Sequence, residues 1–367
     1  MLKVGMVGVG CISGIYLKNF KEVFKDVELV AVCDLIRERA EKARKEYNIP
    51  KLYDTMEELF ADPEIDIVLN LTRPYQHYEV SKAALLAGKH VYSEKPLGAD
   101  WEEGTQLVNL AIEKGLWIGG APDTFMGAGI QTCRKLIDEG LLGEVIGGRC
   151  VMGSHGVESW HPDPDFYYQR GGGPLLDMGP YYITALINLL GGVKKVYAAS
   201  RTTFGERLIT AEPHVGEIIK VNVPTHYEIL MTFENDITIS FLTSFDVYDT
   251  KQANIQLYGT KGNLYVPDPN CFGSQKGMRF LDGKTGEERE LPLEFDYADN
   301  SRCLGLDDLA AAIEQGRPPR VSYKQTYHVL EVMAGAMKSA ETGEPYVLTT
   351  KFEREAPMDA TKAHGYL

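Results

Sequence analysis

The sequence predicts a two-domain protein, with an α/β N-terminal domain built on a parallel sheet and an α+β C-terminal domain built on an open, mostly antiparallel sheet. Its 367 residues exceed what one hydrophobic core usually serves, so two domains are expected. Up to about residue 120, short apolar runs alternate with helical patterns, which is typical of a parallel sheet. Beyond Gly120 the strands lengthen and alternate between polar and apolar residues. We therefore expect domains at 1–122 and 123–350 and a tail at 351–367.

The first domain is expected to alternate strands and helices. The apolar runs predict strands at residues 3–9, 28–33, 66–71, 90–93 and 116–119, and the amphipathic stretches predict helices at 37–47 and 101–114. Thr55 and Glu58 have the spacing of a capping box, which predicts a further helix start. The run Ile67-Val68-Leu69 does not alternate, as expected for a strand covered by helices on both faces.

The second domain is expected to begin with a helix at 131–139 and to continue with longer strands. Residues 227–233 and 237–244 flank Glu234-Asn235-Asp236 as a hairpin, and 254–258 is a strand followed by a turn at 259–262. Helices are expected at 305–315 and 324–342, the second packing back against the first domain.

Composition narrows the class of partner. A formal net charge of -14 argues against nucleic acid or an acidic membrane surface. No apolar run approaches a membrane span, and the first residues read as a strand and turn rather than a signal peptide. The six cysteines form no C-x-x-C pair, so reduced thiols and a cytoplasmic location are expected. A small-molecule substrate fits these features best.

A glycine loop follows the first expected strand. Gly8, Gly10 and Ser13 form G-x-G-x-x-S, in which the first glycine permits a tight turn and the second lets the backbone approach a pyrophosphate. The third position needs a small residue, which Ser13 or Gly14 supplies. With Cys11 and Ile12, the loop opens a helix whose N-terminus suits an anion. The pattern predicts a Rossmann domain that binds a dinucleotide.

Asp34 lies 21 residues after Ser13, at the end of the second strand. A carboxylate there hydrogen-bonds the adenosine ribose and repels a 2'-phosphate, which favours NAD. Arg37 and Arg39 follow closely and keep NADP open as an alternative.

Three further motifs occur in order: Thr72-Arg73-Pro74-Tyr75-Gln76-His77, Glu94-Lys95-Pro96, and the segment from Gly171 to Tyr181 that contains Asp177. Together with the glycine loop they resemble the glucose-fructose oxidoreductase, inositol dehydrogenase and rhizopine-catabolism (Gfo/Idh/MocA) family. The resemblance runs from Val4 to at least Tyr346. It implies an oxidoreductase acting on a sugar, polyol or glycoside, with cofactor contacts from Thr72, Pro74, His77, Glu94 and Lys95.

The resemblance also implies that Lys95 lies beside the nicotinamide and the reacting hydroxyl. Asp177 and Tyr181 are four residues apart in a helix that Pro174 can start, so both can face one cleft. Family members often have histidine where this chain has Tyr181, although glucose-fructose oxidoreductase is similar in using tyrosine. We expect a relay in which the Lys95 ammonium favours the Tyr181 phenolate and Asp177 orients a substrate hydroxyl. The alternative is that Tyr181 is a core aromatic residue and Asp177 only a carboxylate near a helix N-terminus.

The segment 154–170 is rich in residue types that contact sugars. The expected substrate contacts are His155, Glu158, Trp160, His161, Tyr168 and Arg170, with Asp123 at the domain junction. A well-packed surface loop is the alternative. His155, Glu158 and His161 also suggest a metal site by spacing, but His161-Pro162 disfavours a continuing helix and no metal is expected.

Two other functions stay open: a glycosidase that uses NAD transiently, and a non-catalytic sensor that binds a dinucleotide. Retention of Lys95, Asp177 and Tyr181 together argues against the sensor. Because open sheets tend to be covered, a homodimer or homotetramer through the second domain is expected.

Overall fold

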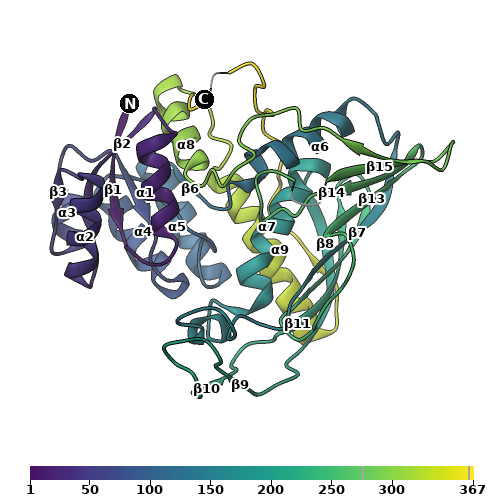
Figure 1. Ribbon diagram of the computed structural model, residues 1–367, viewed down its shortest axis with the longest axis horizontal. Coiled ribbons are helices and arrows are strands. Elements are labelled where there is room, and N and C mark those ends of the chain that lie inside the picture. The colour runs from purple at the N-terminus through teal and green to yellow at the C-terminus, as the bar shows by residue number, and fades with distance from the viewer. Residues whose placement is uncertain (275–276, 363) are drawn as a thin grey trace.

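The first of the two large sheets in the computed structural model is parallel throughout and has the strand order β3-β2-β1-β4-β5-β6 (Figure 1). The structure describes residues 1–274, 277–362 and 364–367. The strands are β1 (Leu2–Val7), β2 (Val27–Cys33), β3 (Lys51–Leu52), β4 (Ile67–Asn70), β5 (His90–Ser93) and β6 (Ile118–Gly120). The helices are α1 (Ser13–Glu22), α2 (Arg37–Tyr47), α3 (Met56–Ala61), α4 (His77–Leu86) and α5 (Trp101–Lys114), with a 3-10 turn η1 (Pro74–Gln76). The order reverses between β1 and β4, where doubly wound sheets bind ligands.

Local chemistry explains where these elements begin and end. All four residues of β4 are buried, as the non-alternating run predicted. The capping box of Thr55 and Glu58 is present at the start of α3. Asp100 caps α5 by accepting a hydrogen bond from the Glu103 backbone N–H at 2.9 Å, and Gly115 ends the helix with φ of 65°.

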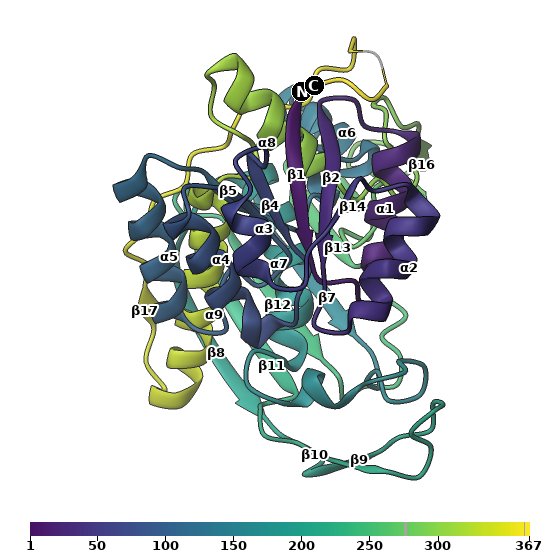
Figure 2. The same ribbon diagram turned by 90° about the vertical axis from the view of Figure 1, so that its left-hand side faces the viewer.

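The second sheet has nine strands in the order β16-β15-β14-β13-β7-β12-β11-β8-β17. They are β7 (Val145–Gly153), β8 (Val193–Arg201), β11 (His226–Phe233), β12 (Thr238–Ser244), β13 (Ile255–Gly259), β14 (Gly262–Val266), β15 (Met278–Asp282), β16 (Glu288–Leu291) and β17 (Tyr346–Val347). Only β7 and β12 pair in parallel among the described strands of this sheet, so the prediction of a mostly antiparallel sheet is confirmed. A separate hairpin, formed by β9 (Glu206–Leu208) and β10 (Ile218–Lys220), projects at the bottom of the view in Figure 2.

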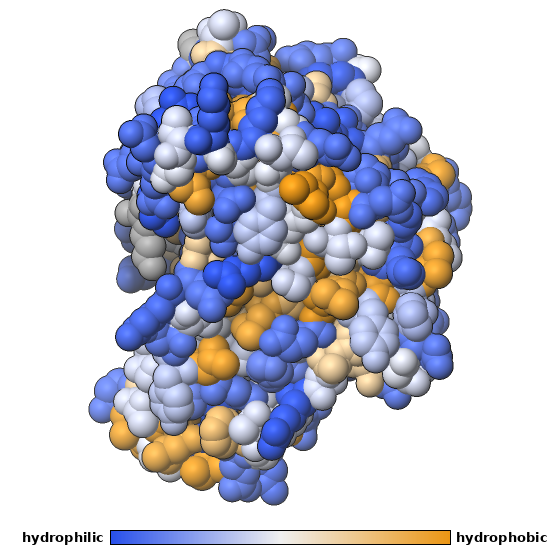
Figure 3. Space-filling view, turned by 90° about the vertical axis from the view of Figure 1, so that its right-hand side faces the viewer, coloured by the Kyte–Doolittle hydropathy of each residue, from blue (hydrophilic) through white to orange (hydrophobic). Residues whose placement is uncertain are grey.

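Helices cover one face of this sheet. They are α6 (Ala128–Asp138), α7 (Gly173–Leu190) and α9 (Tyr323–Thr342), which contact β14, β11 with β12, and β8 respectively. The opposite face exposes Ile146, Tyr197 and Leu230, which are 64%, 45% and 48% accessible. Figure 3 shows apolar side chains gathered on this side of the molecule. The sheet is thus open on one face, as predicted.

The C-terminal helices return to the first domain. Helix α8 (Leu304–Gln315) and helix α9 both contact β6, and α9 also packs on α5. The rings of Trp101 and Tyr327 stack with centroids 4.2 Å apart across this contact. The prediction that the last long helix packs against the first domain is therefore confirmed. None of the helices formed by the described residues combines the length and apolar character needed to cross a bilayer.

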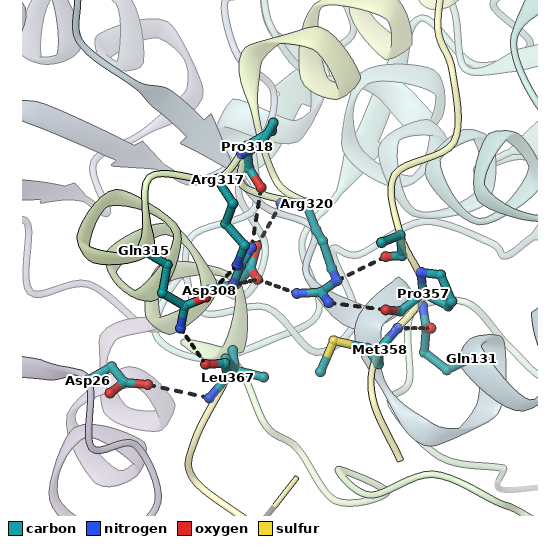
Figure 4. Close-up of polar contacts among 11 residues, drawn as sticks. Asp26, Gln131, Asp308, Gln315, Arg317, Pro318, Arg320, Pro357, Met358 and Leu367 are labelled. Carbon is teal, nitrogen blue, oxygen red and sulfur yellow. Dashed lines mark hydrogen bonds and ion pairs between the residues drawn. The ribbon is translucent and has the colours of Figure 1, made fainter. Parts of the chain in front are cut away.

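The tail after Lys351 is held at several points (Figure 4). Arg320 donates from Nε to the Ala356 carbonyl and from a terminal nitrogen to the Pro357 carbonyl, both at 3.0 Å. The Met358 backbone N–H donates to Gln131 Oε1 at 2.8 Å. Gln315 Nε2 donates to the Leu367 carbonyl at 3.0 Å. The tail thereby links α6 of the second domain to α8, and it lines a cavity of about 200 Å³ beside Arg317 and Arg320.

Candidate active site

The loop after β1 has the conformation that its glycines require. Gly8 has φ of +99°, and a Cβ there would lie 2.8 Å from the Leu71 carbonyl carbon and oxygen, so only glycine fits. A Cβ at Gly10 would meet nothing within 4 Å, which leaves room for a ligand against the backbone. Ser13 Oγ donates to the Gly10 carbonyl at 2.8 Å and its side chain is buried, so the serine fills the third position of the motif. The first turn of α1 carries no acidic residue, which suits a pyrophosphate.

Asp34 closes β2 beside this loop. Its Oδ2 accepts from the Val9 backbone N–H at 2.6 Å and its Oδ1 from the Ile36 N–H at 2.7 Å. Each carboxylate oxygen can accept more than one hydrogen bond, so Asp34 can hold the loop and also receive ribose hydroxyls. Arg37 makes ion pairs with Glu41 and Asp54. These residues fit a dinucleotide with free ribose hydroxyls, because the Asp34 carboxylate would repel a 2'-phosphate and Arg37 is paired with carboxylates.

Two of the expected cofactor contacts are buried. His77 is 1% exposed, and its Nδ1 and Nε2 lie 2.8 Å from the Pro96 carbonyl and 3.0 Å from the Thr72 carbonyl. Burial lowers its pKa although both carbonyls favour the charged ring. The His77 ring joins the loops that follow β4 and β5, and a contact with the cofactor stays a prediction.

Glu94 is 8% exposed and accepts from the Tyr16 hydroxyl at 2.8 Å and from the Lys95 backbone N–H at 3.1 Å. It therefore braces the loop that carries Lys95. Thr72 donates from Oγ1 to Asn70 Oδ1 at 2.6 Å, and with Pro74 it remains on the partly exposed loop at the carboxyl end of β4.

Lys95, Asp177 and Tyr181 meet at the carboxyl end of β5. Lys95 Nζ donates to Asp177 Oδ1 at 2.6 Å and to the Asp177 carbonyl at 2.8 Å. Both side chains are mostly buried, at 15% and 16% exposure. Burial favours the neutral amine, but the charges of Asp177, Tyr181 and Glu94 outweigh it and raise the pKa of Lys95. Lys95 is thus a fixed cation between the two domains.

Tyr181 lies under this ammonium rather than bonded to it. Lys95 Nζ is 5.2 Å from the centroid of the Tyr181 ring, which is a cation–π geometry. Burial raises the pKa of Tyr181, and the charges of Lys95 and Arg302 act in the opposite direction without reversing it. Lys95 thus favours the Tyr181 phenolate as the expected relay requires, but the net effect of the surroundings favours the phenol. The relay itself stays a prediction.

Two residues of the site were missed by sequence reasoning. Arg302 comes from the turn before α8, more than 100 positions after Tyr181, and no spacing rule connects them. Tyr167 lies in the aromatic segment, where burial and then the Asp177 carboxylate raise its pKa, with Lys95 acting against them. It neighbours Tyr168 in the turn η3 (Asp165–Tyr168), and only the direction of that turn decides which ring faces Asp177. The only feature of the sequence that pointed to Tyr167 was the enrichment of aromatic residues in the segment 154–170.

The expected sugar contacts Glu158 and Tyr168 are used elsewhere. Tyr168 is fully buried and its hydroxyl donates to Glu158, which also accepts from Arg207 at 3.0 Å. Arg207 further donates to Asp246 at 2.5 Å. These four residues form a buried charge cluster, in which Glu158 and Tyr168 are bonded within the protein, so a contact of either with substrate stays a prediction without support from this geometry.

Arg170 and Asp123, also expected to contact substrate, are bonded to other parts of the protein. Arg170 makes ion pairs with Asp100 and Glu103 at the start of α5 and so clamps the second domain to the first. Asp123 is 1% exposed and accepts from the backbone N–H groups of Cys303 and Gly305 at 3.1 and 3.0 Å. Burial raises its pKa to about 6, and these hydrogen bonds only partly offset that shift. Its role is to anchor the N-terminus of α8.

The remaining residues expected to contact substrate are His161, Trp160 and His155, and they lie in different surroundings. His161 accepts from the Asp163 backbone N–H at Nδ1, which leaves Nε2 as the donor of the neutral ring, and the Asp177 charge acts on it. Trp160 is 63% exposed beside it. His155 stacks on Tyr248 at 3.9 Å between ring centroids. Within the described parts of the chain, no three His, Cys, Asp or Glu side chains converge as metal ligands do.

A doubly wound sheet with a glycine loop at its switch point, and a lysine–aspartate pair at the carboxyl end of a neighbouring strand, define a nicotinamide dinucleotide oxidoreductase. Residues 2–119 match the family model described as oxidoreductase family, NAD-binding Rossmann fold, and residues 130–265 match the GFO/IDH/MocA C-terminal domain. The chain belongs to the Gfo/Idh/MocA oxidoreductase family.

Named relatives are distant in sequence and similar in length. A trans-1,2-dihydrobenzene-1,2-diol dehydrogenase from Bos taurus is 26% identical over 293 residues, covering 80% of each chain. A D-glucoside 3-dehydrogenase from Escherichia coli strain K12 is 25% identical over 348 residues, covering 93% of this chain and 96% of the relative. The structure of levoglucosan dehydrogenase in complex with NADH and L-sorbose superposes with a TM-score of 0.80 at 19% identity, covering 95% and 99% of the two chains. That likeness shows a shared fold.

Proposed function

We propose that this chain is an NAD-dependent dehydrogenase or reductase acting on a secondary hydroxyl or ketone of a sugar, polyol or glycoside. The observation that carries the proposal is the buried pair of Lys95 and Asp177 beside Tyr181, on the domain face where the glycine loop opens. The names of the relatives, which include a glucoside dehydrogenase and a diol dehydrogenase, support a polyhydroxylated substrate.

In the proposed mechanism Gly8, Gly10, Ser13 and Asp34 would hold the dinucleotide, and the chemistry it would supply is hydride transfer. Tyr181 exchanges a proton with the substrate oxygen: its oxygen takes the hydroxyl proton during oxidation, and its phenol donates that proton during reduction. Lys95 supplies a positive charge beside the oxygen on which negative charge develops. The three side chains are held by the carboxyl end of β5 and by α7, so little reorganisation is needed.

The substrate contacts are proposed to be fewer than the sequence indicated. Asp177 Oδ1 is bonded to Lys95, and among the described residues its Oδ2 makes no hydrogen bond, so that oxygen can orient a neighbouring hydroxyl. His161 and Tyr167 lie within the electrostatic reach of Asp177. They are the proposed hydroxyl contacts, with Trp160 as an exposed ring for stacking.

The test is a panel of sugars, polyols and glycosides with NAD and with NADP, read at the absorbance band of the reduced cofactor. We expect turnover with NAD and a loss of about 10²- to 10⁴-fold in Tyr181→Phe. Tyr366→Phe, which alters a tyrosine that is 52% exposed in the C-terminal tail, is the matched control. Near wild-type turnover in Tyr181→Phe contradicts the assigned role. Product without stoichiometric NADH would indicate transient oxidation by a glycosidase, and binding without turnover would indicate a sensor.

The same proposal includes an assembly, a location and a domain division. The exposed apolar side chains of Ile146, Tyr197 and Leu230 support a homodimer or homotetramer through the open sheet face. Sedimentation of wild type and Leu230→Lys tests it, and an unchanged oligomeric state in the variant argues against that face. The six unpaired cysteine thiols support a cytoplasmic location. The proposed domains are residues 1–122 and 123–350, followed by the tail 351–367.

A further inference from the structure

Helix α1 buries a row of polar side chains along one side. Ser13, Tyr16 and Asn19 follow each other at intervals of three residues, so they lie on the same side of the helix, and each is at most 3% exposed. Apolar residues usually occupy the buried side of a helix, because a buried polar group costs energy unless it is hydrogen-bonded. Each of these three side chains is hydrogen-bonded, and each bond leads to a different part of the chain.

The three bonds connect α1 to the elements around it. Ser13 Oγ donates to a carbonyl of the glycine loop at 2.8 Å. Asn19 Nδ2 donates to two carbonyls of the turn before α8, at 2.9 and 2.7 Å. Tyr16, between them, donates from its hydroxyl to Glu94 Oε1 at 2.8 Å, in the loop after β5. The helix whose N-terminus suits a pyrophosphate is thus bonded through Tyr16 to the loop that carries Lys95.

Glu94 extends that connection to Lys95. Its other oxygen, Oε2, accepts from the Lys95 backbone N–H at 3.1 Å, and the side chain is 8% exposed. At the far end of the lysine, Nζ donates to Asp177 Oδ1 at 2.6 Å and to the Asp177 carbonyl at 2.8 Å. Lys95 is therefore held at its backbone by the first domain and at its ammonium by the second.

The bond from Tyr16 to Glu94 is of a kind that is costly to lose. A hydrogen bond to a carboxylate is stronger than one between neutral groups, and a buried acceptor that loses its donor is left desolvated. Without the Tyr16 hydroxyl, Glu94 Oε1 has to turn toward water or another donor, and the backbone that Oε2 holds shifts with it. A displacement of about 1 Å at a reacting group is enough to slow a reaction substantially.

We propose that Tyr16 is a positioning residue for Lys95: its hydroxyl fixes Glu94, and Glu94 fixes the backbone from which the lysine ammonium reaches Asp177. The inference rests on the proposed function, in which Lys95 is the catalytic cation, and adds to it a residue that is fully buried and contacts neither substrate nor cofactor. The helix that would bind the dinucleotide and the cation that would act on the substrate are thereby held as one unit.

The first test follows Lys95 in cofactor-free protein, by its rate of acetylation with acetic anhydride, with the site identified by mass spectrometry. The reagent attacks the free amine, so a lysine held as an ammonium by Asp177 reacts slowly. Tyr16→Phe is expected to speed acetylation of Lys95 about tenfold, because the displaced ammonium is held less well. Tyr346→Phe is the matched control, since it removes a hydroxyl that donates to Glu331 Oε1 at 3.1 Å, at the edge of the second sheet. It should leave the rate at Lys95 unchanged.

The second test asks whether Tyr16 acts through Glu94. Glu94→Gln alone is expected to speed acetylation of Lys95 as well. Adding Tyr16→Phe to Glu94→Gln should change the rate by less than about twofold, because residues that act through one network are not additive. Two fully additive effects overturn the proposal. Should Tyr16→Phe not fold, an unchanged rate in Glu94→Gln overturns it equally.

The third test uses the complete enzyme with NAD and a substrate from the panel. Tyr16→Phe is expected to lower kcat about tenfold and to change the KM for NAD by less than about threefold, because the glycine loop is intact. A raised KM for NAD with kcat unchanged assigns Tyr16 to the cofactor helix alone and overturns the proposal.

Acetylation at the wild-type rate in Tyr16→Phe also overturns it, as does an equal acceleration in Tyr346→Phe. Because acetylation requires neither substrate nor cofactor, it decides the role of Tyr16 even where the sugar panel gives no turnover. An unchanged acetylation rate in an enzyme that oxidises sugars removes Tyr16 from the mechanism and leaves the proposed function standing.

Discussion

Asp307 is a buried carboxyl whose protonation should govern part of the pH dependence of stability. It is fully buried, its Oδ1 accepts from the Asp26 backbone N–H at 3.0 Å, and among the described atoms Oδ2 has no partner. Burial and the charge of Asp26 raise its pKa to about 8. Between its ordinary value near 4 and about 8, the unfolded chain releases a proton that the folded chain retains. Stability therefore falls as pH rises through this window.

Asp307→Asn keeps an acceptor oxygen and removes this titration. We expect the variant to gain stability relative to wild type between pH 5 and pH 8, on the order of 1.4 kcal/mol for each pH unit at most. Urea unfolding at both pH values measures the difference between the two proteins. Asp236→Asn, at a position 83% exposed, is the control and should show no such trend. Parallel stability curves for wild type and Asp307→Asn would contradict the assignment.

At the residue scale, the sequence predicted contacts between side chains that lie close together along the chain. Asp177 and Tyr181 share a helix face, so their convergence followed from a four-residue separation. The position of Lys95 followed from its place after a parallel strand. Arg302 was not predictable, because its approach depends on α8 returning to the first domain. The choice of Tyr167 over Tyr168 depends on a turn whose direction composition does not encode.

At the element scale, chain segments with strong local signals were predicted well. Helices α2 and α5 and strand β5 have the predicted bounds, and β11 pairs with β12 as the expected hairpin. The parallel pairing of β7 with β12 was not predicted, since the two strands are joined through α7 and four other strands, β8 to β11. The β9–β10 hairpin was also missed, because strands of three residues give too short a pattern.

That hairpin supplies an anchor for the segment 154–170. Arg207 on β9 is 5% exposed and donates to Glu158, Asp246 and the Phe245 carbonyl. Its guanidinium carbon also lies 4.7 Å from the centroid of the Phe204 ring. Removing one partner from a buried ion pair usually costs about 3–5 kcal/mol, because the remaining charge stays buried.

We expect Arg207→Met to lose stability on that order and to raise KM more than it lowers kcat, because the segment that carries His161 and Tyr167 loosens. Combining it with Glu158→Gln and Asp246→Asn removes the stranded carboxylates and should recover much of the stability. Urea unfolding and steady-state kinetics on the best substrate of the panel measure both effects. A triple variant no more stable than Arg207→Met would show that charge burial is not the cause.

At the scale of the whole molecule, exposed ion pairs alone cannot explain how the domains hold together. Arg73–Asp163 and Arg170–Asp100 join the domains, but all four side chains are 43–59% exposed. Pairs of this kind contribute about 0–1 kcal/mol each. The apolar packing of α9 on α5 and β6 provides the larger interface, and among the tail contacts of Figure 4 the one that reaches the first domain is the hydrogen bond from Leu367 to Asp26.

The tail is expected to contribute to the stability of the fold although its described residues form no helix or strand. Its contacts include the Arg320 bonds to Ala356 and Pro357, and the burial of Met358, which is 8% exposed. Asp308, whose side chain is fully buried, still pairs with Arg317 and Arg320 after the tail is removed. Removing the tail is therefore expected to cost only the stability that its own contacts contribute, because it leaves no buried charge unpaired in the part of the chain that the structure describes.

Deletion of residues 356–367 is expected to lower the free energy of unfolding by about 2–4 kcal/mol, roughly the burial of one Met side chain together with several hydrogen bonds. Deletion of residues 366–367 alone removes the Leu367 contacts with Gln315 and Asp26 and should cost less than about 1.5 kcal/mol. Urea unfolding followed by circular dichroism, with tryptophan fluorescence reporting on the first domain through Trp101 and Trp117, measures both. Equal losses in the two deletions would place the stabilising contacts at the last two residues. No loss in either would show that the tail contacts do not stabilise the fold.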